Sequence, residues 1–556
     1  MLAKLDPSIG IAAELVNLYG LLVQFLLREE TTLVYYNPSG LDCSWNSHWP
    51  WNLTTHPQIV WQRSFPHSGL NDRFNRETML LACLPEGPDG VAQLESLANN
   101  LNHLRTVRLL IEVVGSGQDL LASQLLSTCL RAGVMNVELY FRNYNHSLIL
   151  YTYRAFPRFE LVKRGIGKGV ELFSNKLLNL QGHRLRVMPD LSPPNTFDYL
   201  DAKGEKQVAG FLWDFIATFA NSINASLEVI RPNWRVIAVP ESSFMLEYTA
   251  KGSIDVGLTT TFVSKRNILA LNQYTYPVLI SSWCTMLPVE RPLPTAKLFE
   301  RILCPALAVI LPLIIVVGWL LLRHRRWLIN LRMARIVPRL VVLLLMATCN
   351  AQLLSLLISP PYQERITSFD DMLDNELSIL GMRTEFYNFE GTFRARYAGI
   401  FHLIDDPDEL YDLRNHFNTS WAYTMPFTKW LVINTQQRFF SKPVFRLAND
   451  LCFCDFLPSS IVVAPHSIYW VSLKDFTLIA EQFGLIKHWI RKSYYDMVKA
   501  GRMSIKDYSQ LVVLKPLGIG DLELVWRICG AATLLAVVIF LMELMFFYIN
   551  VFLNNL

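Results

Sequence analysis

The sequence predicts a mixed α/β protein that is interrupted by membrane-spanning helices. Three observations support this prediction. The second half of the chain contains long uncharged apolar segments, strands alternate with amphipathic helices on both sides of the first two segments, and only 18% of the 556 residues are charged. A disordered or nucleic-acid-binding chain would be more polar, so both classes are disfavoured and no nucleic-acid partner is expected.

Three segments are long and apolar enough to cross a bilayer, which takes about 20 helical residues. Ile302–Leu322 and Leu340–Ser359 hold no charge, and Ile528–Phe552 holds one acid, Glu543. The segment 323–339 between the first two holds six arginines and no acid. Short loops of this composition lie in the cytosol.

The predicted topology therefore places residues 1–301 and 360–527 outside the cell, with the large N-terminal part extracellular. Four sequons lie in these outside segments and are candidate glycosylation sites: Asn52, Asn145, Asn224 and Asn418. The nine cysteines allow disulfides outside, but their pairing cannot be read from sequence. Cys452-Phe-Cys454 lacks zinc-site spacing, so neither a metal nor a cofactor is expected. Residues 1–29 form a poor signal-like segment, because polar residues interrupt the apolar stretch.

Residues 30–178 predict an extracellular N-terminal α/β domain. Thr31–Tyr36, Val107–Val114 and Asn136–Phe141 have strand composition, and Asp119–Ala132 has helical leucine spacing. No residue pattern in this domain indicates catalysis.

Residues 183–300 predict a second α/β segment. The expected strands are His183–Met188, Ser226–Ile230 and Ile254–Leu258, and the last leads into Thr259, Thr260 and Thr261. The expected helices are Gly210–Ala220 and Phe244–Ala250. This alternation favours a parallel sheet.

Residues 360–522 predict a third α/β segment. Ser368 is expected to cap a helix ahead of two acids, and strands are expected at Leu377–Leu380 and Ser459–Ala464. Phe476–Ser493 has the pattern of one long amphipathic helix. Neither this segment nor the preceding one looks complete alone, so the two are expected to form lobes that close over a small ligand.

Six short motifs follow one another in a fixed order. They are Gly210-Phe-x-x-Asp214; Gly252-Ser-Ile-Asp-Val-Gly-Leu-Thr-Thr260 ahead of Arg266 and Tyr274-Thr-Tyr-Pro277; Ala347-Thr-Cys-Asn-Ala-Gln-Leu-Leu-Ser-Leu-Leu-Ile-Ser-Pro360; Ile366-Thr-Ser-Phe-Asp-Asp371; Phe483-Gly-Leu-Ile-Lys-His-Trp489; and Leu541-Met-Glu-Leu544. In this order the chain resembles the ionotropic glutamate receptors over about 183–548. More narrowly, it resembles the divergent insect ionotropic receptors of chemosensation.

The resemblance implies a periplasmic-binding-protein-like ligand domain, with lobes 183–300 and 360–522, that is split by transmembrane helices. It implies a chemosensory ligand-gated cation channel subunit rather than an enzyme, and no catalytic motif opposes this. The second span would be the gate helix, with Thr348, Asn350, Gln352 and Ser355 as its polar residues. The location implied is the plasma membrane, in a sensory-neuron dendrite or cilium.

The resemblance also implies ligand contacts. Arg266 is the nearest match to an arginine that holds a ligand carboxylate, although a solvated arginine beside Lys265 is an equal alternative. Thr260 and Thr261 match a hydroxyl-bearing contact site or a structural turn, and Thr392 is the candidate in the second lobe. The family's acid for a ligand amine has no match in 423–428, so glutamate is not the expected ligand.

The pore region departs from the family. A re-entrant helix and filter loop would lie between the first two spans, and the 17 residues of 323–339 are too few and too basic for them. The expected partners are therefore co-receptor subunits of the same family, in a hetero-tetramer within the lipid bilayer. A sequence truncated by a missed exon and a non-conducting, membrane-anchored small-molecule receptor are the alternatives. A transporter would need more spans.

Overall fold

The computed structural model divides the chain into two units. Unit 1 consists of Met1–Cys284, Met425–Phe439 and Cys452–Lys506, and unit 2 of Thr285–Thr424, Phe440–Leu451 and Asp507–Leu556. The residues described are 7–28, 31–48, 57–61, 78–101, 104–105, 107–143, 148–166, 172–231, 242–262, 272–293, 297, 312, 316, 332–359, 361–374, 377–465, 467–509 and 518–554.

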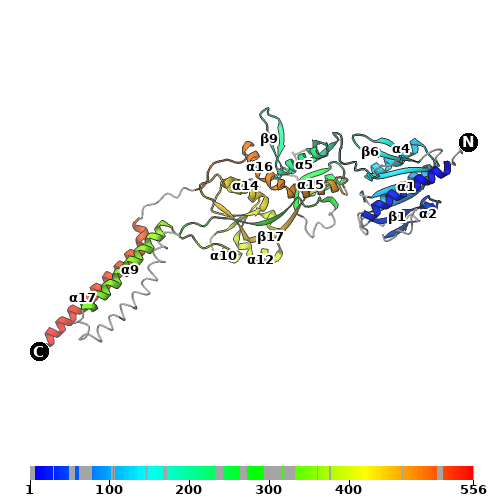
Figure 1. Ribbon diagram of the computed structural model, residues 1–556. Coiled ribbons are helices and arrows are strands. Elements are labelled where there is room, and N and C mark those ends of the chain that lie inside the picture. Colours follow the sequence, from blue (N-terminus) through cyan, green and yellow to red (C-terminus); the bar gives the residue numbers. More distant parts are fainter. Residues whose placement is uncertain are drawn as a thin grey trace. The chain divides into compact units, whose positions relative to one another are not determined.

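The N-terminal part of unit 1 is a seven-stranded sheet (Figure 1). Its strands are β1 (Thr32–Tyr36), β2 (Gln58–Trp61), β3 (Thr78–Pro85), β4 (Arg108–Ser116), β5 (Asn136–Asn143), β6 (Ile149–Arg154) and β7 (Glu160–Gly165). The first five pair in parallel in the order β2-β1-β3-β4-β5, and β6 and β7 continue the sheet antiparallel. This is a doubly wound order. The three strands predicted within 30–178 are confirmed as β1, β4 and β5.

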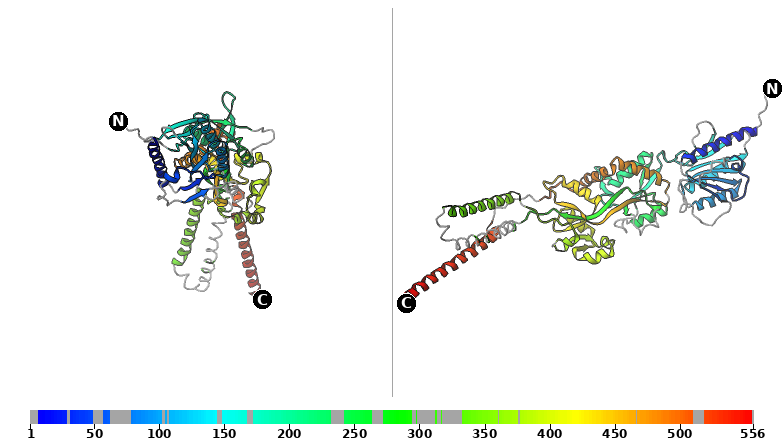
Figure 2. Two further views of the ribbon diagram at one scale, coloured as in Figure 1. Left: turned by 90° about the vertical axis from the view of Figure 1, so that its right-hand side faces the viewer. Right: turned by 60° about the horizontal axis from the view of Figure 1, so that its bottom comes forward.

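Helices cover both faces of this sheet. Alternate residues of β1 point to opposite faces, so Val34 and Tyr36 pack with α3 (Pro88–Asn100) and α4 (Asp119–Arg131). Leu33 and Tyr35 pack instead with α1 (Pro7–Arg28) and near α2 (Trp45–His48). The segment predicted as signal-like contains α1, which lies along the N-terminal sheet (Figure 2). The apolar face of α1 is buried in the domain core.

The second sheet begins in unit 1. Its strands there are β8 (Arg184–Pro189), β11 (Ser226–Val229) and β12 (Val256–Phe262), with β8 parallel to both others. The connecting helices are α5 (Phe211–Ser222) and α6 (Ser242–Ala250), and β9 (Phe197–Leu200) pairs with β10 (Lys206–Ala209) as a separate hairpin. The predicted strand–helix–strand–helix–strand order and the parallel pairing of its three strands are confirmed. The whole sheet is mixed, because β12 pairs antiparallel with a later strand.

Two later segments of the chain, Met425–Phe439 and Cys452–Lys506, complete unit 1. The predicted single helix at Phe476–Ser493 is wrong, because the structure has α15 (Trp470–Gln482) and α16 (Leu485–Lys499). The break falls at Gly484, whose φ of 69° lies in the left-handed region. Both helices pack on α5, where the Phe215 ring lies 5.2 Å from Phe476 and 6.2 Å from Trp489. Helix α14 (Phe427–Gln437) packs on α16.

Two long strands run through both units. β13 (Leu279–Pro288) passes from unit 1 into unit 2, and β17 (Phe445–Val463) passes back. Unit 2 adds β14 (Ile379–Met382), parallel to β15 (Phe401–Ile404) and β16 (Ala422–Pro426). Its short helices are α10 (Phe369–Asp374), α11 (Arg383–Phe386), α12 (Gly391–Tyr397) and α13 (Pro407–Asn415).

The predicted cap of α10 is confirmed. Ser368 Oγ accepts a hydrogen bond from the Asp371 amide at 3.0 Å, and Asp371 Oδ2 accepts one from the Ser368 amide at 2.9 Å. This reciprocal pair satisfies two amides that the first helical turn leaves open. These hydrogen bonds lower the pKa of Asp371 to about 2.

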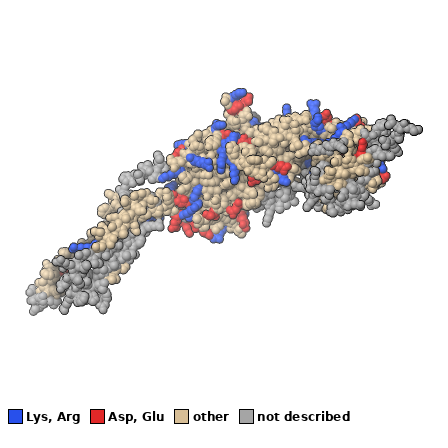
Figure 3. Space-filling model, viewed as in Figure 1, with Lys and Arg blue, Asp and Glu red and all other residues tan. Residues whose placement is uncertain are grey.

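Two long helices belong to unit 2, α9 (Arg332–Ile358) and α17 (Glu523–Asn554) (Figure 1). Within the described residues, one helix is long and apolar enough to span a bilayer, Glu523–Val551, with a mean hydropathy of 2.4 and no part of its apolar window buried by protein. It contains the predicted span Ile528–Phe552 except for the last residue. Figure 3 shows little charge on the visible, described parts of these helices.

The predicted loop 323–339 is wrong in its second half, because residues 332–339 are the first turns of α9. Hydropathy marks the part of a helix suited to hydrocarbon, and a helix can continue beyond that part with charged residues in water. The predicted span Leu340–Ser359 is helical to Ile358. The predicted span Ile302–Leu322 lies almost wholly outside the described residues.

Candidate functional site

The clearest polar site in unit 1 lies just beyond the carboxyl end of β8. Asp190 is 2% exposed, and its carboxylate accepts hydrogen bonds from the Thr196 hydroxyl (2.6 Å), the Asn195 amide group (2.7 Å) and the Ser192 backbone (3.0 Å). Open α/β sheets bind ligands at the carboxyl ends of their strands. Asp190 is therefore placed where a ligand site is expected, with its oxygens already satisfied by the protein.

Burial dominates the electrostatics of Asp190. Desolvation raises its pKa to about 6, although the hydrogen bonds from Asn195, Thr196, Ser192 and Thr259 act in the opposite direction. The carboxyl group therefore changes charge in mildly acidic solution.

Asn195 joins this site to the predicted threonines. Its Nδ2 donates to Asp190 and also to Thr260 Oγ1, at 3.1 Å. Thr260 and Thr261 lie inside β12 rather than beyond the strand, because Thr261 pairs with Ser460 of β17 and thereby extends the ladder. The hydroxyls of Thr261 and Ser460 are buried, and neither has a hydrogen-bond partner among the described residues.

The glycine of the first motif is required by close packing around this site. Gly210 has φ of 119°, and a Cβ there would lie 2.3 Å from the Asn195 carbonyl oxygen. The first α5 amides, of Phe211 and Leu212, donate to the carbonyls of Pro194 and Asn195, both at 3.1 Å. The start of α5 is thus fixed against the loop that carries Asn195.

The acids of the first two motifs have structural partners. Asp214 pairs with Lys492 of α16, with distances of 3.0 and 2.8 Å from Nζ to its two oxygens. Asp255 accepts two side-chain hydrogen bonds from Arg186 of β8, at 2.8 and 3.2 Å. These motif positions hold helices and strands together and lie outside the Asp190 site.

The remaining predicted ligand residues are Arg266 and Thr392. Arg266 lies outside the described residues. Thr392 is exposed at the start of α12 in unit 2. The polar contact at the carboxyl end of β14 is instead made by Glu385, whose Oε2 accepts from the Thr424 hydroxyl at 2.9 Å.

The predicted gate residues are all exposed on α9. Thr348, Gln352 and Ser355 follow the i, i+4, i+7 spacing that places residues on one helical face, and Asn350 lies on the other side. The structure therefore divides the four residues into a polar stripe of three and one separate residue.

Two of the candidate glycosylation sites can be placed. Asn224 is exposed in a turn, where its Nδ2 donates to Asn179 Oδ1 at 2.8 Å. Asn418 is half-buried, and its Oδ1 accepts from the Ser420 amide at 2.9 Å. Asn52 and Asn145 lie outside the described residues.

The structure supplies two disulfides that sequence could not pair. Cys43 bonds to Cys83 in the N-terminal domain, and Cys284 bonds to Cys452. Cys284 and Cys452 are the residues at which β13 leaves unit 1 and β17 enters it. Asp455 lies near these two sulfurs, but a disulfide does not offer two thiolates to a metal.

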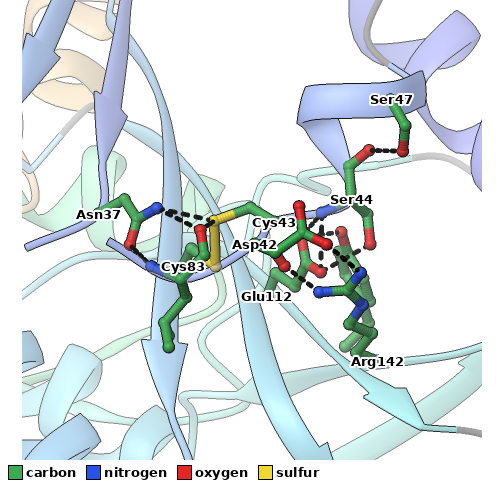
Figure 4. A network of polar contacts seen from close by, with 10 residues as sticks. Asn37, Asp42, Cys43, Ser44, Ser47, Cys83, Glu112 and Arg142 are labelled. Carbon is green, nitrogen blue, oxygen red and sulfur yellow. Dashed lines mark hydrogen bonds and ion pairs between the residues drawn. A yellow bond between two sulfur atoms is a disulfide. The ribbon is translucent and has the colours of Figure 1, made fainter. Parts of the chain in front are cut away.

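A second polar network surrounds the Cys43–Cys83 disulfide (Figure 4). Glu112 of β4 is 1% exposed and accepts from Ser44 Oγ at 2.6 Å and from Tyr140 OH at 2.9 Å. Burial raises the pKa of Glu112. The contacts attach the Ser44 segment to the sheet, so this network has a structural role.

Sequence reasoning missed Asp190, Asn195 and Thr196. A usable signal was present, since an acid directly after a buried strand is followed by further polar residues within one short loop. The motifs around Gly210 and Thr260 mark the neighbouring elements but not this loop.

No family model and no curated protein matches the chain. Among solved structures, the crystal structure of the AvGluR1 ligand-binding domain in complex with glutamate matches 57% of this chain and 97% of its own, with 12% identity and a TM-score of 0.33. At this TM-score the similarity does not define the fold, which follows from the strand order of the two sheets.

Proposed function

We propose that the protein is a membrane-bound small-molecule receptor and, more specifically, a chemosensory ligand-gated cation channel subunit that acts with co-receptor subunits. One observation carries the proposal. Unit 1 is built from chain that lies both before and after α9, while α9 and α17 belong to unit 2. A ligand that binds one arrangement of these interleaved units better than another shifts the population toward that arrangement and so toward the corresponding position of the helices.

The proposed ligand region is the carboxyl edge of β8 and β12, with Asn195 and Thr260 as the polar contacts and Arg266 as the carboxylate partner. Asp190 acts through Asn195, whose side chain it orients. We propose a small ligand other than glutamate. The subunit is proposed to function at the plasma membrane of a sensory neuron, in a hetero-tetramer.

A specific observation favours the second candidate, a non-conducting membrane-anchored receptor. Because α9 begins at Arg332, only the nine residues 323–331 separate it from the end of the predicted first span. A re-entrant pore hairpin needs more chain than this. Conduction by this subunit would then depend on filter segments from its partners.

Voltage clamp separates the two candidates. Cells express the chain alone or with family co-receptor subunits, and receive a panel of small carboxylic acids, amines and amino acids. The proposal predicts ligand-evoked cation current only in the mixture. It also predicts that Thr260→Ala or Arg266→Ala abolishes the current at unchanged surface expression, while Thr218→Ala, an exposed control on α5, leaves it intact. No current in any mixture, with the protein at the surface, would favour the non-conducting receptor.

A further inference from the structure

Two segments of unit 2 flank the first two predicted spans and pair with each other. Residues 289–293 follow β13 and lead toward the predicted first span, and residues 361–366 follow α9. The Leu293 amide donates to the Pro361 carbonyl at 2.8 Å, and the Gln363 amide donates to the Arg291 carbonyl at 2.9 Å. Pro292 and Tyr362 form an antiparallel bridge between these two paired linkers.

One side chain of β17 holds both paired linkers. Arg446 donates from Nε to Glu290 Oε1 at 2.7 Å, and its Nη2 lies 2.6 Å from the same oxygen. Nη2 also donates to the Ile366 carbonyl at 3.0 Å. Glu290 belongs to the first linker and Ile366 to the second, so a single guanidinium contacts both.

The burial of this contact distinguishes it from the surface ion pairs of unit 2. The Arg446 and Glu290 side chains are 16% and 19% exposed, whereas Arg383 and Asp405, paired at 2.8 Å, are 45% and 73% exposed. Exposed pairs contribute little because water and salt screen them. Removing one partner from a partly buried, charge-assisted pair has a much larger effect.

The position of Arg446 gives this contact a mechanical consequence. Residues 445–451 of β17 belong to unit 2, and the strand continues directly into unit 1 from Cys452. A movement of β17 would move the linkers as well, because Arg446 attaches both of them to the strand. Close by, the Val289 amide donates to the Val444 carbonyl at 2.8 Å.

We propose that Arg446 is a positioning residue that clamps both paired linkers to β17 and so transmits ligand-driven movement to α9 and to the segment ahead of the first predicted span. This inference rests on the proposed function for its transmission step. The clamp itself does not depend on that function.

Cross-linking of the full-length protein in cell membranes tests the clamp. Pro292→Cys and Tyr362→Cys place two thiols on the antiparallel bridge, and copper phenanthroline oxidises them, with the linked peptides quantified by mass spectrometry. Adding Arg446→Ala should slow this cross-link about tenfold, as expected when a charge-assisted hydrogen bond is lost. Arg446→Lys, which keeps the charge but not the fork, should recover part of the rate.

The matched control is Arg383→Ala, which removes the exposed ion pair and should leave the cross-linking rate unchanged. An equal rate in the Arg446→Ala and wild-type backgrounds would overturn the clamp. An equal loss with Arg383→Ala would overturn it too, because the effect would then be a general weakening of unit 2.

Recording the co-expressed channel tests transmission, with the same mixture of carboxylic acids, amines and amino acids as the probe. Arg446→Ala should lower the maximal evoked current at least threefold with little change in the half-maximal concentration, and Arg446→Lys should recover part of it. A purely stabilising role would lower surface expression instead. Cross-linking that depends on Arg446 with an unchanged maximal current would overturn transmission. If the wild-type mixture gives no current, transmission falls with the proposed function, while the cross-linking result still decides the clamp.

Discussion

The buried carboxyl group of Asp190 should make the stability of unit 1 depend on pH. Its pKa rises from 3.8 to about 6 on folding, so the folded state binds the proton more tightly than the unfolded state. The contribution to stability is therefore complete below pH 3.8 and is lost as the pH rises through 6. The rise corresponds to about 3 kcal/mol at 1.36 kcal/mol for each tenfold change in proton affinity.

Asp190→Asn removes this titration and is the perturbation that tests it. The lost acceptor oxygen adds a destabilisation that is the same at every pH, so only the pH dependence of the difference between variant and wild type is informative. From pH 4 to pH 7 the wild type should lose on the order of 2 kcal/mol relative to the variant, which is more than a tenfold change in the opening equilibrium.

Hydrogen exchange of the full chain in detergent, followed by mass spectrometry on peptides from β8 and β12, measures that change locally. Comparing wild type and variant at the same pH cancels the intrinsic exchange rate. Asp475→Asn, an exposed acid on α15, serves as the control and should show no such trend. A variant-to-wild-type ratio of protection factors that is constant with pH would refute the reasoning.

Three further predictions concern the fold. Cys284→Ser removes a disulfide whose cysteines are 168 residues apart in sequence, and it should lower the free energy of unfolding by up to about 5 kcal/mol. Thermal or denaturant unfolding measures this loss. The control is Cys454→Ser, which replaces a free cysteine and should change the free energy of unfolding little. Gly210→Ala should destabilise unit 1 by about 2 kcal/mol more than Gly204→Ala. Both glycines have a positive φ, but only at Gly210 would a Cβ lie against backbone atoms. Equal melting temperatures of the two variants would contradict this. Ser368→Ala removes the α10 cap and should cost about 1 kcal/mol, seen as faster hydrogen exchange confined to that helix; unchanged exchange would count against the capping role.

The strands were predictable because buried strands are rich in apolar residues. Every residue of β1 and nearly every residue of β3 is buried, which gives continuous apolar runs that only a covered parallel sheet requires. The end of β12 was not predictable in the same way. Its ladder continues to Thr261 only because Ser460, almost 200 residues later, supplies the partner.

Helix ends and site contacts depended on similar long-range information. The apolar spacing of 476–493 continues across Gly484, so the pattern alone did not show the break that its left-handed backbone makes. The contact between Asn195 and Thr260 joins a loop to a strand 65 residues later in the chain. The ends of disulfide Cys284–Cys452 lie still further apart, and composition does not choose among the possible pairs.

The stripe on α9 allows the most direct test of the claim that ligand binding opens a conducting pathway beside this helix. Thr348→Cys, Gln352→Cys and Ser355→Cys are each expressed with co-receptor subunits, and a charged methanethiosulfonate reagent is applied outside while current is recorded. We predict that the reagent changes the ligand-evoked current at all three positions and does so faster with ligand present, but leaves Asn350→Cys unaffected. Modification that is equal at all four positions, or that is independent of ligand, would contradict a gate on this face of α9.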